Sequence, residues 1–354
     1  MLPELNARGV VNDIAYSPRF NPQFGAEIEV ATQGASAAFP VRMARTLNLS
    51  YHAIALKQLR RLLRRGGYDL IHCHSTMAGL VGRLAAGGAG LPVVYTPHCP
   101  VFATRLPAAQ RRVGLVLERL LAGRTTRYIA VSEFERRIFL DHRIGIPEAI
   151  ACIYNGIDVA AFDAWPALGR RELNLGEGDF VIGCIDRLTL QKNQTALLRA
   201  LALLAGGNWR LLLVGGGEMT GEVRALAEQL GIGDRIAWMH QVGDARAYHA
   251  ACDVIAHPSL WDSCPYTVLE AMAASRPVAG ADVGGVGELL GGAGRLGAPE
   301  DIERLAANIG ALGADTELSR SLGAEGRERL VERFPLEKMV EGTIGVYEAV
   351  VTAR

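Results

Sequence analysis

Residues 257–287 read HPSLWDSCPYTVLEAMAASRPVAGADVGGVG and place two carboxylates, Asp262 and Glu270, eight residues apart. Ser263 or Asp262 suits the N-cap of a helix, and Pro265 suits its first position. The following LEAMAAS is typical of a helix, which ends before the proline of S-R-P. The segment therefore predicts Asp262 in a loop and Glu270 in the first two turns of the helix that follows.

The start of this helix is suited to bind phosphate. The N–H groups of Tyr266, Thr267 and Val268 have no partners inside the helix and lie at the positive end of its dipole. Phosphates bind at such ends, and two nearby carboxylates can accept hydrogen bonds from sugar hydroxyls. We therefore expect a sugar-nucleotide site. The alternative is that Glu270 only caps a helix and Asp262 is a solvated loop residue, which would give the same pattern.

Two cations follow an apolar segment in the middle of the chain. Arg187 and Lys192 lie five residues apart in DRLTLQKN, directly after the predicted strand 180–185. Cations at the end of a strand can hold a diphosphate and stabilise it as it leaves. Two surface cations at the start of a helix are the alternative.

A glycine run and a histidine each follow a strand. Gly215, Gly216 and Gly217 come after LLLV and allow the backbone to approach a ligand closely, but they do not form a G-x-G-x-x-G fingerprint. His98 ends YTPH, and His72 lies in the neighbouring HCHS. A lone histidine in this position is more often structural than catalytic.

Short apolar strands alternate with amphipathic helices in both halves, which predicts two parallel-sheet α/β units. We expect strands at 10–16, 68–73, 91–96, 128–131, 149–154, 180–185, 209–214, 235–239 and 254–256. We expect helices at 51–65, 77–86, 111–121, 194–204, 222–230, 245–251, 301–312, 318–332 and 335–351, with another after Ser132. The predicted domains are 1–165, 166–335 and a final helix at 336–354, with a linker near 164–169.

Composition indicates an ordinary globular protein of 354 residues with balanced charge. No apolar run reaches the roughly 18 residues of a membrane span, no signal peptide is evident, and the six cysteines lack metal-binding spacing. These features predict a cytoplasmic protein with reduced thiols and no metal site.

The charge is not evenly distributed along the chain. Residues 1–165 hold 19 Lys and Arg against 12 Asp and Glu, and the remainder holds 18 against 25. The basic half suits an anionic membrane surface or a phosphate-bearing acceptor, or is simply solvated, and nucleic acid is not favoured.

Taken together, these motifs resemble the GT4 family of retaining glycosyltransferases. The D-x7-E of residues 262–270 resembles the family's E-x7-E, DRLTLQKN is similar to G-R-L-x-x-x-K-[GN], and YTPH contains the family's T-x-H. Two departures are Asp262 in place of Glu and Asp186 in place of Gly. The YTPH and HCHSTMAGLVGRLAA segments look most like transferases of bacterial polysaccharides and lipid-linked glycans.

The resemblance implies a GT-B fold, with two Rossmann-like domains facing across a cleft, and metal-independent transfer of a hexosyl group. It assigns Arg187 and Lys192 to the donor diphosphate, Glu270 to the ribose, and Asp262 and His98 to the sugar around the reacting centre. It assigns the remaining donor contacts to Gly215, Gly216, Val242 and the helix N–H groups at 266–268. The donor would be a UDP- or GDP-sugar and the acceptor a hydroxyl of a glycan or polyprenyl-linked molecule, with no cofactor.

One part of the family pattern has no counterpart. Residues 2–8 are typical of the end of a first helix, and we expect no counterpart of the family's first strand and glycine-rich loop before them. This leaves open a donor-binding pseudoenzyme without turnover, and another GT-B enzyme such as a sugar-nucleotide epimerase. An NAD-dependent Rossmann enzyme is disfavoured because the dinucleotide fingerprint is missing.

Overall fold

The computed structural model describes residues 1–18, 34–44, 48–204, 206–240 and 244–353. The chain divides into two compact units. The first unit contains Met1–Tyr154 and Glu337–Arg354, and the second contains Asn155–Leu336. None of the helices in the described part of the chain combines the length and hydrophobicity of a membrane span.

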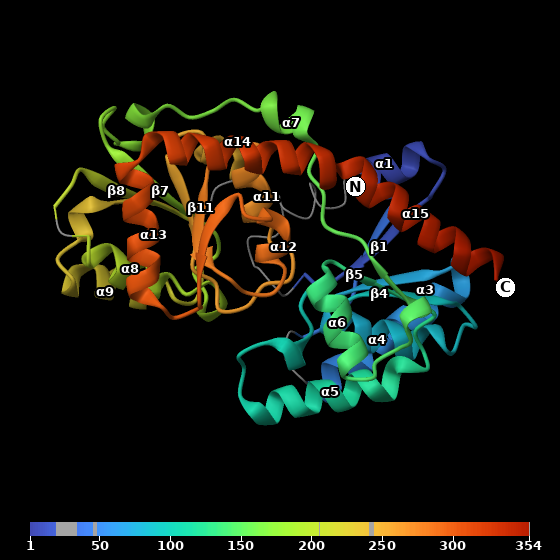
Figure 1. Ribbon diagram of the computed structural model, residues 1–354. Coiled ribbons are helices and arrows are strands. Elements are labelled where there is room, and N and C mark those ends of the chain that lie inside the picture. Colours follow the sequence, from blue (N-terminus) through green and yellow to red (C-terminus); the bar gives the residue numbers. More distant parts are fainter. Residues whose placement is uncertain (19–33, 45–47, 205, 241–243, 354) are drawn as a thin grey trace. The chain divides into compact units, whose positions relative to one another are not determined.

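The first unit is built on a four-stranded parallel sheet with the order β3-β4-β5-β6 and a separate parallel pair, β1-β2 (Figure 1). Its strands are β1 (Asp13–Tyr16), β2 (Ala37–Pro40), β3 (Ile71–His74), β4 (Val93–Thr96), β5 (Arg127–Ala130) and β6 (Ile150–Cys152). Its helices are α1 (Leu2–Ala7), α3 (Leu49–Arg65), α4 (Thr76–Ala86), α5 (Ala108–Ala122) and α6 (Glu133–Asp141), and α15 (Leu336–Thr352) packs on its sheet.

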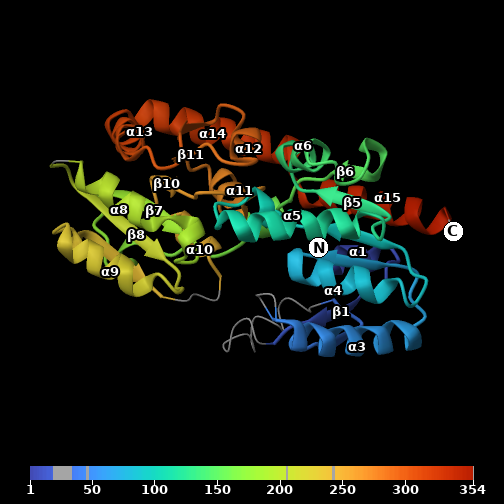
Figure 2. The same cartoon turned by 90° about the horizontal axis from the view of Figure 1, so that it is seen from below.

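Helix α3 shows why this unit has a layer of helices beside its sheet. Its buried residues Ala55, Leu59 and Leu63 recur every four positions, so one stripe is apolar. That stripe packs on α4, which in turn contacts α5 (Figure 2). On α15, Tyr347 and Val350 are buried against residues of β4 and β5, which ties the last helix to this sheet.

The second unit has one six-stranded parallel sheet with the order β12-β11-β10-β7-β8-β9. Its strands are β7 (Phe180–Ile185), β8 (Trp209–Val214), β9 (Ile236–Met239), β10 (Val254–His257), β11 (Val278–Ala281) and β12 (Gly294–Gly297). Its helices are α7 (Val159–Asp163), α8 (Gln194–Ala202), α9 (Thr220–Gln229), α10 (Arg246–His249), α11 (Tyr266–Ala273), α12 (Val286–Leu290), α13 (Ile302–Ala314) and α14 (Thr316–Arg333). A single core joins the central strands to α8, α9 and α13.

The predicted α/β class with parallel sheets is confirmed. Strands β7 and β8 match the predicted bounds to the residue, whereas β2, β11 and β12 were not predicted. Their sequences AAFP, VAGA and GRLG are rich in Ala, Gly and Pro, which are depleted in strands, so they carry no local strand signal. The segment 164–169, predicted as a linker, lies within the second unit.

Candidate functional site

The D-x7-E segment folds at the carboxyl end of β10, where parallel strands of an open α/β sheet commonly present ligand-binding loops. Asp262 lies in the loop after β10, and Glu270 is the fifth residue of α11, as the sequence predicted. The predicted cap is wrong: α11 begins at Tyr266, Pro265 takes the N-cap position, and no side chain caps the helix. The Asp262 carboxylate does not cap because it pairs with a lysine from another segment.

Two of the three expected N–H donors remain at the start of α11. Val268 donates its N–H to the Pro265 carbonyl at 3.2 Å, so the prediction that this donor is free is wrong. The tight first turn lets one carbonyl accept from both Val268 and Leu269. Within the described residues, the N–H groups of Tyr266 and Thr267 have no hydrogen-bond acceptor, so these two can point to a ligand.

Lys192 joins the segment after β7 to the loop after β10. It ends a short 3-10 helix, Leu190–Lys192, and its Nζ lies 2.5 Å from Asp186 Oδ2 and 2.8 Å from Asp262 Oδ2. All three side chains are largely buried. Burial alone would lower the pKa of Lys192, but the two carboxylates outweigh it and raise the pKa above its ordinary value. Lys192 is therefore a charged ammonium held between two carboxylates.

Asp186 also reaches the start of α11. The Thr267 hydroxyl donates to the Ile185 carbonyl at 3.1 Å and lies 3.3 Å from Asp186 Oδ2. The Asp186 carboxylate thus links the ammonium of Lys192 to the first turn of the helix. The sequence marked Asp186 only as a departure from the family pattern, and its pairing with Lys192 was missed.

Glu270 lies in a second, separate part of the site. Burial, followed by the negative charges of Asp244 and Asp186, raises the pKa of Glu270 to about 7, while Arg246 opposes this shift. The Nε2 atom of His249 lies 3.8 Å from Glu270 Oε2. Glu270 can therefore change its charge near neutral pH.

The tautomer of His249 follows from its other nitrogen. Nδ1 lies 3.1 Å from the Ala245 carbonyl, which can only accept, so Nδ1 carries the proton. Burial lowers the pKa of His249 to about 4, so Nε2 is unprotonated near neutral pH. This nitrogen is buried and has no hydrogen-bond partner, because the nearest Glu270 oxygen, at 3.8 Å, lies beyond hydrogen-bond distance.

His257, the last residue of β10, stands in a similar relation to Asp262. Its Nε2 is buried without a partner and lies 4.0 Å from Asp262 Oδ2. Burial, followed by the charge of Lys192, lowers the pKa of His257 to about 3. The ring is therefore neutral and adds no cation to the cluster. The positions of His249 and His257 next to the two carboxylates were not predicted, because no motif assigns a role to either histidine.

Arg187 lies beside this cluster but does not join it. Its side chain is exposed and forms no ion pair with any residue that the structure describes, while its carbonyl accepts from Gln194. Gly215 supports the same segment: its φ is +132°, and a Cβ there would lie 2.2 Å from the Asp186 carbonyl oxygen. Gly216 accepts from the N–H of Leu188 at 3.0 Å. The glycine run therefore packs against the backbone that carries Arg187.

In the first unit, a turn with unusual backbone geometry holds His98. His98 and Cys99 both have positive φ, at 51° and 75°, which is uncommon for residues other than glycine. The buried carboxylate of Glu135 accepts from the N–H of Cys99 at 2.6 Å and from that of Val131 at 2.8 Å. His98 Nε2 lies 3.0 Å from His74 Nδ1, so one of these nitrogens donates to the other. The turn and the neighbouring ring together fix the His98 side chain.

His72 makes different contacts from those of His98. Its ring nitrogens lie 2.6 Å from the Tyr347 hydroxyl and 2.8 Å from the Thr96 hydroxyl. Burial and then the nearby His74 hold the pKa of His72 well below its ordinary value. His72 therefore links β3, β4 and α15, in agreement with the structural role that the sequence suggested.

Comparison with known proteins identifies the family. The model for "Glycosyl transferases group 1" matches residues 168–329, and the model for "Glycosyltransferase Family 4" matches residues 1–161. A D-inositol 3-phosphate glycosyltransferase of Salinispora arenicola is 30% identical over 315 residues, which cover 81% of this chain and 70% of the relative. The chain belongs to glycosyltransferase family 4.

Other relatives of this glycosyltransferase are also glycosyltransferases by name. The putative glycosyltransferase EpsD of Bacillus subtilis is 29% identical and covers 92% of this chain, which spans 90% of EpsD. The UDP-Gal:alpha-D-GlcNAc-diphosphoundecaprenol alpha-1,3-galactosyltransferase of Escherichia coli is 28% identical over 70% of this chain and 67% of its own length.

Solved structures agree with the GT-B prediction. The sucrose-phosphate synthase of Thermosynechococcus elongatus superposes with a TM-score of 0.84 at 22% identity, over 100% of this chain and 92% of its own. Anabaena Alr3699/HepE, solved in complex with UDP-glucose, gives 0.80 at 24% identity, over 92% and 89%. At these identities the likeness establishes the fold, which is GT-B.

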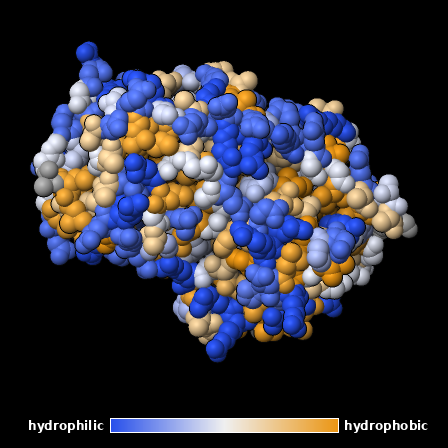
Figure 3. Space-filling model, in the orientation of Figure 1, coloured by the Kyte–Doolittle hydropathy of each residue, from blue (hydrophilic) through white to orange (hydrophobic). Residues whose placement is uncertain are grey.

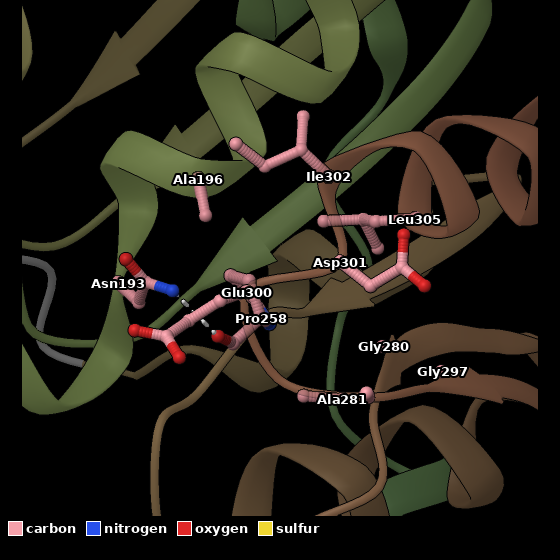
Figure 4. Close-up of a pocket in the computed structure, with 11 residues that line it drawn as sticks. Asn193, Ala196, Pro258, Gly280, Ala281, Gly297, Glu300, Asp301, Ile302 and Leu305 are labelled. Atoms are coloured by element: carbon pink, nitrogen blue, oxygen red, sulfur yellow. Dashed lines mark hydrogen bonds between the residues drawn. The ribbon is translucent and has the colours of Figure 1, made fainter. Parts of the chain in front are cut away.

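Among its described residues, the second unit of the glycosyltransferase has a small hollow and a larger one. One, at the ends of β10, β11 and β12, encloses about 10 Å³ and has room for a single water molecule (Figure 4). Asn193 donates to the Pro258 carbonyl at 3.3 Å in its wall, and none of the predicted donor residues line it. The other, more open hollow of about 630 Å³ is lined in part by Trp165, His240 and Asp244.

His240 lies two residues before Val242, which the family resemblance assigned to the donor. Its Nε2 accepts from Arg224 Nη2 at 2.7 Å. Val242 lies outside the described residues. No group of three or more potential metal ligands occurs within the described parts of the chain.

Proposed function

We propose that this family 4 glycosyltransferase moves a hexosyl group, with retention, from a UDP- or GDP-sugar to a hydroxyl of a glycan or polyprenyl-linked acceptor. The observation that carries the proposal is the arrangement at the start of α11. There, free N–H groups and two separately placed carboxylates from residues 262–270 meet a cationic segment at residues 187–192. A sugar nucleotide needs these groups: donors for the diphosphate and acceptors for hydroxyls of the ribose and the sugar.

The cations and the helix end would share the diphosphate. Lys192 is already compensated by Asp186 and Asp262, so the exposed Arg187 supplies the uncompensated positive charge next to the N–H groups of α11. These groups stabilise the charge that develops on the leaving phosphate, the role that a metal ion plays in other enzymes. In this proposal Lys192 chiefly orients Asp262 toward the transferred sugar.

Glu270 would hold the ribose, and the hollow beside His240 would receive the base. A volume of about 630 Å³ lies within the range of small-molecule sites, and Trp165 and Trp238 give its wall aromatic surface. The complex of Anabaena HepE with UDP-glucose and the UDP-galactose named for the Escherichia coli relative favour uridine as the base. For His98 we keep the role suggested by the T-x-H resemblance, a contact to the transferred sugar.

Isothermal titration calorimetry with UDP-, GDP- and ADP-sugars, without added metal, tests the donor site. We expect a UDP-sugar to bind with a Kd in roughly the micromolar to millimolar range. Glu270→Ala should weaken this affinity about tenfold to a hundredfold, because hydrogen bonds to a charged group contribute roughly 1.5–3 kcal/mol. Arg187→Ala should weaken UDP-sugar binding more than uridine binding. Glu303→Ala, an exposed acid on α13, serves as the control. Failure of every sugar nucleotide to bind would reject the proposal.

Transfer is tested separately with acceptors. The name of the Escherichia coli relative suggests a polyprenyl-diphosphate-linked sugar as the first acceptor and a soluble oligosaccharide as the second. We expect release of UDP that depends on the acceptor and a product with the anomeric configuration of the donor, read by NMR. Binding without transfer to any acceptor would identify a donor-binding protein, and an epimerised donor without acceptor would identify an epimerase.

A further inference from the structure

Three histidines gather where β3 and β4 end in the first unit. His72 and His74 lie on one face of β3, because side chains alternate along a strand and Cys73 between them is buried in the core. His98 follows β4 by two residues and lies in the turn of positive φ. Over the face of the first unit that Figure 3 shows, hydrophobic and hydrophilic residues are interleaved, as on an ordinary protein surface. The histidine cluster is the more specific feature of this unit.

The three rings differ in how many of their nitrogens are occupied. His72 uses both, on the hydroxyls of Tyr347 and Thr96. It also packs against His74, with ring centroids 4.0 Å apart. His74 and His98 share a single contact, between His74 Nδ1 and His98 Nε2 at 3.0 Å. Within the described residues, His74 Nε2 and His98 Nδ1 have no protein partner, and both residues are exposed. Each of these two rings therefore keeps one nitrogen for a ligand.

The contact between His74 and His98 has the geometry of a hydrogen bond in the plane of both rings. The ring planes are inclined by only 18°, and the centroids are 5.3 Å apart, which exceeds the N–N distance of 3.0 Å by about one ring width. The two nitrogens therefore point at each other, in the linear arrangement that hydrogen bonds prefer. The backbone is held separately, because the buried Glu135 carboxylate accepts the N–H of Cys99. His98 is thus fixed both at its backbone and at its ring.

The hydrogen bond couples the tautomers of the two rings. Although each residue keeps accessible surface, burial of the rings lowers the pKa of His74 to about 3 and that of His98 to about 4, so both are neutral near neutral pH. A neutral imidazole has one donor and one acceptor nitrogen. If His74 Nδ1 donates, the proton of the His98 ring is on Nδ1. If His98 Nε2 donates, the proton of the His74 ring is on Nε2. In either case both rings have the same tautomer.

We propose that His74 is a positioning residue of this glycosyltransferase, which orients His98 so that Nδ1 of His98 meets the transferred sugar. The inference rests on the proposed function, which gives His98 the contact to that sugar. It adds the contacting atom and a second histidine on which the contact depends. A sugar hydroxyl can both donate and accept, so it can bind His98 Nδ1 in either tautomer.

Long-range 15N NMR of the histidine rings tests the hydrogen bond without any substrate. The chain has eight histidines, and the signals that disappear in His74→Phe and in His98→Asn identify the two rings. We expect both rings to have the same tautomer in the parent chain, and His98 to change its tautomer balance in His74→Phe. His142→Phe is the control, because the His142 ring contacts the Ile138 carbonyl of α6 and its loss should leave His98 unchanged.

Substitutions that imitate one imidazole nitrogen test the contacting atom. The amide of asparagine can replace Nδ1 and that of glutamine can replace Nε2, because of their distances from the backbone. We therefore expect His98→Asn to retain more transfer activity than His98→Gln. If the chain binds a donor without turnover, the same order is expected in the affinity for the UDP-sugar.

Variants of His74 test the positioning role. His74→Phe should lower kcat about tenfold, because a small misplacement at a reacting centre can cost up to about a hundredfold. His74→Asn keeps an amide in the place of Nδ1 and should recover most of this loss. The affinity for UDP, measured by calorimetry, should stay unchanged in every variant, because UDP lacks the sugar. Circular dichroism confirms that each variant is folded.

Three results would overturn the inference. The first is different tautomers in His74 and His98, and the second is a more active His98→Gln than His98→Asn. The third is a His74→Phe variant with the kcat and the UDP-sugar affinity of the parent chain. A parent chain that binds no sugar nucleotide would reject the proposed function, and the sugar contact of His98 with it. In that case the tautomer measurement would still show separately whether His74 holds the ring.

Discussion

Replacing Lys192 by methionine should destabilise the second unit strongly, because it leaves two buried carboxylates without their shared cation. Asp186 Oδ2 and Asp262 Oδ2 lie 2.5 Å and 2.8 Å from Nζ, so they are at most about 5.3 Å apart. At an effective dielectric constant of about 20, two negative charges at that separation repel by about 3 kcal/mol. Removing one partner of a buried ion pair typically costs about 3–5 kcal/mol, which is consistent with this value.

Urea unfolding followed by tryptophan fluorescence measures the loss of unfolding free energy in the second unit of the chain. All four tryptophans lie in the second unit: Trp165, Trp209, Trp238 and Trp261. We expect Lys192→Met to lower the free energy of unfolding by about 3–5 kcal/mol at pH 7 with an unchanged m-value. The loss should shrink toward acid pH, because protonation of either carboxylate removes the repulsion.

A second variant separates repulsion from lost packing. In Asp186→Asn/Lys192→Met only one carboxylate remains charged, so about 3 kcal/mol of the loss should be recovered. Arg171→Met is the control, because its pair with Glu177 is exposed and the N–O distance is 3.5 Å. Such a pair contributes little, and we expect no change beyond about 0.5 kcal/mol. The reasoning is refuted if Lys192→Met costs less than about 1 kcal/mol, or if the double variant is no more stable than the single one.

Three further predictions concern other parts of the chain. The pKa of Glu270 is raised to about 7, so the folded protein keeps a proton that the unfolded chain loses near pH 4.5. The free energy of unfolding should therefore fall by up to about 3 kcal/mol as pH rises from about 4.5 to 7. Urea unfolding at pH 5 and 8 should show that Glu270→Gln removes this dependence. Gly284→Ala should lower the melting temperature and UDP-sugar affinity in a thermal-shift assay, because its Cβ would lie 1.5 Å from the Asp262 carbonyl oxygen and φ is +57°; an unchanged melting temperature would contradict this. Arg83→Met should destabilise the first unit by about 3–5 kcal/mol, since Glu118 would stay buried without its cation, and Arg83→Met/Glu118→Leu should recover most of that loss in far-UV circular dichroism; equal stability of the two variants would argue against it.

The fold was predictable where burial is strong along one segment. Residues 180–185 and 209–214 are almost wholly buried and rich in β-branched or large apolar residues, so their bounds were predicted to the residue. The VAGA of β11 is equally buried but has almost no intrinsic strand preference. It becomes a strand because it pairs with β10 and β12, which a local pattern does not reveal.

The local structure around the candidate site was predictable, but its contacts were not. The spacing of Asp262 and Glu270 placed one in a loop and the other on a helix, because both positions follow from local chain geometry. The N-cap prediction was wrong because it allowed the Asp262 carboxylate only local donors. Lys192, which is 70 residues away, offers a charge-assisted hydrogen bond at 2.8 Å that a backbone N–H does not match.

The two buried histidines show why the charge state of such a motif depends on the tertiary fold. His257 lies 4.0 Å from Asp262, and His249 lies 3.8 Å from Glu270. Each has a buried Nε2 without a hydrogen-bond partner. The acids themselves differ: Asp262 pairs with the ammonium of Lys192, whereas burial and the charges of Asp244 and Asp186 raise the pKa of Glu270 to about 7. In the proposed function, one motif thus supplies an ion-paired carboxylate for the sugar and a proton-linked one for the ribose. That difference comes from burial and from Lys192, Asp186 and Asp244, none of which belongs to the D-x7-E motif.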